Sequence, residues 1–68
     1  MSLQDDPLIQ EIKSRLNEEI KRTSDWIANG SASTFEEYKK QCGKIIGFNA
    51  AIVVIDEAIE NFTKDDDD

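Results

Sequence analysis

The chain has 68 residues, a formal net charge of −7, no histidine and a single cysteine, Cys42. This composition leaves room for one domain and excludes disulfides, histidine bases, histidine zinc sites and cysteine–histidine nucleophiles. Asp and Glu outnumber Lys and Arg by 15 to 8, which argues against a phosphate-binding surface. No apolar run approaches the roughly 20 residues that span a bilayer. We therefore expect a non-enzymatic protein without cofactor, metal or small-molecule substrate, and without direct contact with nucleic acid or membrane.

The first predicted element is a helix over residues 7–29, preceded by an N-terminal arm, residues 1–6. Asp6 is placed to cap its start, Pro7 suits the first helical position, and Asn29-Gly30 is typical of a helix end. Charged pairs such as Glu11 with Arg15 and Glu18 with Arg22 have the four-residue spacing of intrahelical ion pairs. Its apolar stripe is expected to contain Ile9, Ile12, Leu16, Ile20, Thr23 and Ile27.

A turn at residues 31–33 is followed by a second predicted helix over residues 34–63 and an acidic tail, residues 64–68. Either Ser33 with Glu36 or Thr34 with Glu37 has capping-box spacing. The expected core stripe contains Tyr38, Cys42, Ile45, Phe48, Ile52, Ile55, Ile59 and Phe62. The short connection predicts an all-α fold: an antiparallel two-helix hairpin that forms a single domain over residues 1–68.

Two patterns in the second half admit other interpretations. The β-branched segment of residues 52–55 favours a strand, but the chain offers no second strand to pair with it. Residues 51–57, an apolar run followed by Asp56-Glu57, look like an element of nucleotide-hydrolysing ATPases. Gly43-Lys44 lacks the phosphate-binding loop that this chemistry needs. We therefore expect a helix with no nucleotide site.

The second helix carries more apolar surface than one shorter partner helix can cover. Beyond the core stripe, Ile46, Val53 and Val54 point to a neighbouring face. The small residues Gly43, Gly47 and Ala50 belong to this surface and suit close approach of another backbone. Self-association or docking on a larger protein is expected there, while the alternative is that Met1 and Leu3 fold back over the overhanging C-terminal turns.

Three single residues have two interpretations each. Trp26 is either an interface anchor or packs under the turn against Phe35. Cys42 is either a small buried hydrophobe or a reactive thiol. Asn49 either sets register in an oligomer or is exposed to solvent. Of these three, we include Trp26 among the candidate interface residues.

The segment Tyr38-x4-Gly43-x3-Gly47, followed by Ala50, Ala51 and Ile52, resembles small acidic helical proteins encoded among the head and neck genes of tailed bacteriophages. The resemblance implies a minor virion or assembly component bound in many copies to a larger phage protein. The corresponding location is the virion or the host cytoplasm. The first six residues lack the basic and apolar regions of a secretory signal, which also leads us to expect an intracellular protein.

Two functions of different kinds remain. The first is a protein–protein interaction module that docks through the second helix. The second is an acidic inhibitor or DNA mimic that occupies a basic groove of an enzyme, using Glu36, Glu37, Asp56, Glu57, Glu60 and the acidic tail. Salt distinguishes them, because a charge-driven complex weakens steeply with ionic strength.

Overall fold

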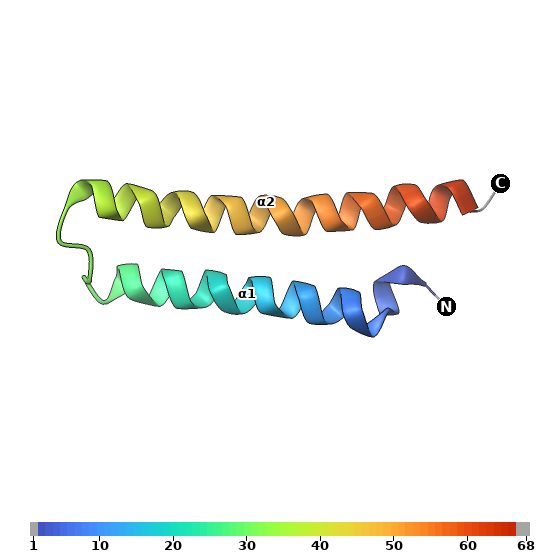
Figure 1. Cartoon of the computed structure of the whole chain (residues 1–68), viewed down its shortest axis with the longest axis horizontal. Coiled ribbons are helices and arrows are strands. Elements are labelled where there is room, and N and C mark those ends of the chain that lie inside the picture. Colours follow the sequence, from blue (N-terminus) through green and yellow to red (C-terminus); the bar gives the residue numbers. More distant parts are fainter. Residues whose placement is uncertain (1, 67–68) are drawn as a thin grey trace.

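The computed structural model describes the backbone of residues 2–66 and the side chains of residues 2–63. Helices α1 (Pro7–Ala28) and α2 (Phe35–Asp66) lie antiparallel, so that both ends of the chain lie at the end opposite the connecting loop (Figure 1). A short 3₁₀ turn, η1 (Leu3–Asp5), precedes α1 and contacts both helices. The molecule measures 53 × 19 × 12 Å. The predicted all-α hairpin is confirmed, and residues 52–55 are helical.

The start of α1 is the capped start that the sequence predicts. The Asp6 carboxylate accepts hydrogen bonds from the backbone N–H groups of Leu8, at 2.8 Å, and Ile9, at 3.4 Å. Pro7 occupies the first turn, where its missing N–H removes a donor that would have had no partner within the helix. The cap fixes the first helical residue at position 7.

The end of α1 is a Schellman motif, in which backbone N–H groups beyond the helix return to its last carbonyls. The Gly30 N–H donates to the Ile27 carbonyl at 3.0 Å, and the Ser31 N–H donates to the Trp26 carbonyl at 3.3 Å. Gly30 has a φ of 71°, the left-handed conformation that glycine adopts without steric cost. The Asn29-Gly30 signal is confirmed.

The start of α2 uses the second of the two predicted capping pairs, with one change. The Thr34 hydroxyl accepts from the Glu37 N–H at 3.1 Å. The Glu37 carboxylate turns back to Ser33 rather than Thr34, and accepts from both its N–H and its hydroxyl at 2.9 Å. These hydrogen bonds, led by the one from the Ser33 backbone, hold the pKa of Glu37 below its ordinary value because they favour the charged carboxylate.

The interhelical seam is thin, because each helix has a single neighbour. Ile59 is 4% exposed and Thr23 is 8% exposed, while most other seam residues are half-buried. Ile12, Tyr38 and Phe62, all expected in the core, are instead exposed. The Lys13–Asp56 ion pair shows which residues of α1 and α2 lie level with each other. This alignment explains why Tyr38 and Phe62 of α2 are exposed. Counting equal steps from it, Phe62 lies level with the first residue of α1 and Tyr38 lies beyond its last.

The open end of the hairpin differs from expectation in two ways. Residues 64–66 were expected in a solvated tail, but α2 continues to Asp66, and the rest of that tail lies outside the described residues. Leu3 does fold back, as the alternative interpretation proposed, and borders an apolar hollow with Ile59 and Phe62. Met1, its expected companion, lies outside the described residues. The overhang is therefore partly covered by the chain itself, although Phe62 remains exposed.

Candidate functional site: the outer face of the second helix

Six of the seven predicted interface residues share one exposed surface, which we call the outer face of α2. Its apolar members remain open to solvent: Ile46 is 69% exposed, Val54 is 61% and Val53 is 53%. The full set, every member of which is exposed, is Gly43, Ile46, Gly47, Ala50, Val53 and Val54. Spacings of three and four residues place these side chains on successive turns of a single helix. Neither α1 nor η1 covers them.

The two glycines of the outer face are not used in packing the hairpin. A methyl group built on Gly43 or Gly47 would meet no atom within 4 Å. Glycine in a helix interior costs about 1 kcal/mol relative to alanine, and no close approach by the described residues requires a glycine at either position. Any close approach of another backbone at these positions would come from outside the described chain.

Helix α1 presents a different outer surface, on which opposite charges pair locally. Arg15 pairs with Glu11 at 2.9 Å, as predicted, and Lys21 pairs with Asp25 at 3.0 Å. Arg22 pairs with Glu19 at 2.7 Å, so the predicted Glu18–Arg22 pair is wrong. All three are pairs of exposed side chains on one helix, and they give α1 a polar surface with its charges balanced at short range.

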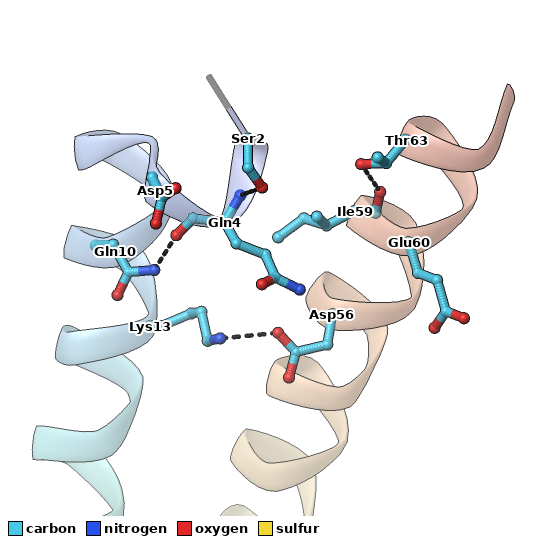
Figure 2. Close-up of a pocket in the computed structure, with 9 residues that line it drawn as sticks. All are labelled: Ser2, Gln4, Asp5, Gln10, Lys13, Asp56, Ile59, Glu60 and Thr63. Atoms are coloured by element: carbon cyan, nitrogen blue, oxygen red, sulfur yellow. Dashed lines mark hydrogen bonds and ion pairs between the residues drawn. The ribbon is translucent and has the colours of Figure 1, made fainter. Parts of the chain in front are cut away.

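An ion pair joins α1 and α2 beside the apolar seam, and the sequence analysis did not predict it. Lys13 Nζ lies 2.8 Å from Asp56 Oδ1. Figure 2 shows this pair below Gln4 in an open polar hollow between the helices, where the Gln10 amide donates to the Gln4 carbonyl. Lys13 and Asp56 each lie beside the apolar stripe of their own helix. Opposite charges beside two facing stripes are the sequence feature that could have predicted this ion pair.

Trp26 is not part of the outer face of α2. It lies near the end of α1 and is half-buried. The structure also argues against packing beneath the turn against Phe35, because Phe35 is exposed and its ring stacks on Tyr38 with centroids 6.2 Å apart. The role of Trp26 as an interface anchor stays a prediction.

The remaining single residues are placed as follows. Cys42 is half-buried on the seam side of α2. Hydrogen bonding with Cys42, and then the charge of its thiolate, raise the pKa of the Tyr38 phenol one turn away. Asn49 is exposed, in agreement with the simpler of its two interpretations.

The acidic residues proposed for an inhibitor or DNA mimic do not form one free surface. Glu37 is engaged with Ser33 at the start of α2, and Asp56 is paired with Lys13. Glu36, Glu57 and Glu60 are exposed. Two of the five acidic residues outside the tail thus already serve the hairpin.

The chemistry available to the described residues is limited. No three His, Cys, Asp or Glu side chains gather in an arrangement that fits a metal ion in this part of the chain. Between residues 2 and 66, neither helix has the length and apolar character required to cross a membrane. Comparison with protein-family models, curated proteins and solved structures finds no match. The outer face of α2 is therefore the best-defined candidate site.

Proposed function

We propose that this chain is a non-enzymatic protein–protein interaction module that docks through the outer face of α2 on a larger protein or on copies of itself. One observation carries the proposal. Ile46, Val53 and Val54 are all more than half exposed, two turns apart on one face of a helix whose opposite side already packs against α1, and exposed Ala50 lies between them. A continuous apolar surface of this kind is typical of binding sites.

The energetics favour a covered face. Full burial of a valine or isoleucine stabilises a complex by about 1.5–3 kcal/mol relative to exposure. Three such residues supply an amount comparable to the lower estimates of about 4 kcal/mol for the entropy lost on association. Within the hairpin Ile59 is the one buried apolar residue among those described, and chains of this size usually need added stabilisation from oligomers, metals or disulfides.

The setting we propose is a minor virion or assembly component of a tailed bacteriophage, in the virion or the host cytoplasm. The support is the resemblance carried by Tyr38, Gly43, Gly47 and residues 50–52. In the structure Gly43, Gly47 and Ala50 are exposed on α2. The segment that carries the resemblance therefore contains much of the surface that we propose for docking.

The test is photo-cross-linking at two positions in cells that naturally express the chain. A photoreactive amino acid replaces Val53 on the outer face of α2 or, as the matched control, Ser24, which is exposed on α1. We expect a covalent adduct from position 53, with this chain or with another polypeptide, and none from position 24. An apolar interface also predicts that the adduct persists at high salt. If neither position gives an adduct, or both do equally, the proposal is wrong.

A further inference from the structure

We propose that the outer face of α2 is covered by a second copy of this chain, with the two α2 helices antiparallel and a twofold axis beside Ala50. This inference rests on the proposed function, because it names the occupant of the same face. Two features support it: the distribution of charge along α2 and the order of large and small residues across the face.

The charges of α2 are separated along the helix rather than paired within it. Residues 35–50 contain three lysines and two glutamates, whereas residues 51–66 contain five acidic residues and one lysine. Lys39 and Lys40 lie before the outer face, and Glu57 and Glu60 lie after it; all four are exposed and unpaired among the described side chains. Lys39 lies over the Phe35 ring, 5.8 Å from its centroid.

The lysines before the outer face and the glutamates after it are too far apart to pair with each other within one helix. Lys39 and Glu60 are 21 residues apart, which at 1.5 Å per residue is about 32 Å along the helix. An antiparallel second copy brings each basic end beside an acidic end, so both ends are neutralised at once. A parallel copy would instead place like charges together, which is unfavourable.

The apolar residues fit the same arrangement. When two antiparallel helices meet at Ala50, residues equally far before and after Ala50 lie level with each other. Ile46 of one copy then lies level with Val54 of the other, and Gly47 lies level with Val53. Gly43 lies level with Glu57 and leaves room for its longer side chain. The two glycines thus each face a larger side chain, which permits close approach of the backbones there, and Ile46 and Val54 form an apolar contact between the copies.

The available area sets the expected affinity. A standard interface buries about 800 Å² per partner, which is about 15% of the 5336 Å² accessible surface of this chain. The outer face with its charged ends is a strip about 32 Å long on a helix about 10 Å wide. Its projected area is therefore about 320 Å², less than half of a standard partner surface, which is the size of a weak, transient interface. We accordingly expect reversible dimerisation with a Kd in the high micromolar range.

The first experiment measures the mass of the purified chain against concentration by sedimentation equilibrium. Val53→Asp should weaken the dimer by at least about 30-fold because it places a charge in the apolar centre. The matched control, Ser24→Asp, adds the same charge to exposed α1 and should leave the dimer unchanged. Lys39→Glu should weaken it by about 10-fold, and adding Glu60→Lys should restore it, because the reversed charges again attract.

The second experiment tests the register by disulfide trapping in a Cys42→Ser background. Ala50→Cys should oxidise readily to a covalent dimer, because the two copies of residue 50 meet at the axis. Gly43→Cys should not link to itself but should link to Glu57→Cys when the two variants are mixed. A monomer at millimolar concentration, or a Gly43→Cys dimer that forms more readily than the Ala50→Cys dimer, overturns the inference.

These results separate the two proposals. If the purified chain stays monomeric while position 53 cross-links to a different polypeptide in cells, the second-copy inference is wrong and the docking function stands. If position 53 gives no adduct, and the purified chain is also monomeric, both are wrong.

Discussion

Replacing Gly47 with alanine tests whether the glycines of the outer face are free of contacts within the hairpin. Alanine is favoured over glycine in a helix interior by about 0.8–1 kcal/mol. A Cβ at position 47 meets no atom within 4 Å, so no steric penalty offsets this gain in the monomer. For a domain of this size, 1 kcal/mol corresponds to a rise in Tm of about 4–8 °C.

The assay is thermal unfolding followed by far-ultraviolet circular dichroism, at a concentration where sedimentation shows a monomer. Gly30→Ala is the matched control: position 30 is equally open, but its φ of 71° disfavours any residue with a Cβ. We expect Gly47→Ala to raise Tm and Gly30→Ala to lower it. A Gly47→Ala monomer with an unchanged or lower Tm would refute the open environment that the structure gives this residue.

Three further substitutions test the seam and the caps. Ile59→Ala should lower the free energy of unfolding by about 2–5 kcal/mol, because Ile59 is 4% exposed; urea titration measures the loss, and Ile59→Val should cost less. Asp6→Ala should cost about 1 kcal/mol in the same assay, whereas Asp5→Ala should cost little. Glu37→Gln tests the lowered pKa of Glu37: the stability advantage of the natural chain should be fully present above the ordinary carboxyl pKa of 4.5 and should disappear as the pH falls through the lower folded-state pKa. An advantage that grows in acid would contradict that sign.

The parts of the fold that could be predicted are those determined by local chemistry. The Asp6 cap and the Gly30 end of α1 depend on residues within one or two turns, and so does the Thr34 cap that precedes α2. The hairpin itself follows from two amphipathic segments joined by a short turn. These interactions are complete within a few neighbouring residues, so a sequence pattern carries nearly all the information needed.

The parts that could not be predicted depend on how the two helices align. Tyr38 and Phe62 belong to the apolar stripe of α2, but Tyr38 lies beyond the last residue of α1 and Phe62 lies level only with its first. The Lys13–Asp56 pair depends on the same alignment, because its members are far apart in the chain. The helical state of residues 64–66 was missed because an acidic tail was expected to be solvated, whereas α2 includes these three residues.

The candidate site could be predicted from the sequence only in part. Periodicity predicted that Ile46, Val53 and Val54 lie outside the seam, and their exposure confirms it. Periodicity did not decide between the two interpretations of Trp26, because an aromatic residue near a helix end fits either an interface or a turn. The separated charges of α2 are visible in the sequence, but the structure is needed to show which of them are exposed and unpaired. In the structure α1 pairs its charges locally, whereas α2 leaves Lys39 and Lys40 exposed before an uncovered apolar face and Glu57 and Glu60 exposed after it. A second antiparallel chain is the simplest arrangement that covers the face and pairs these charges.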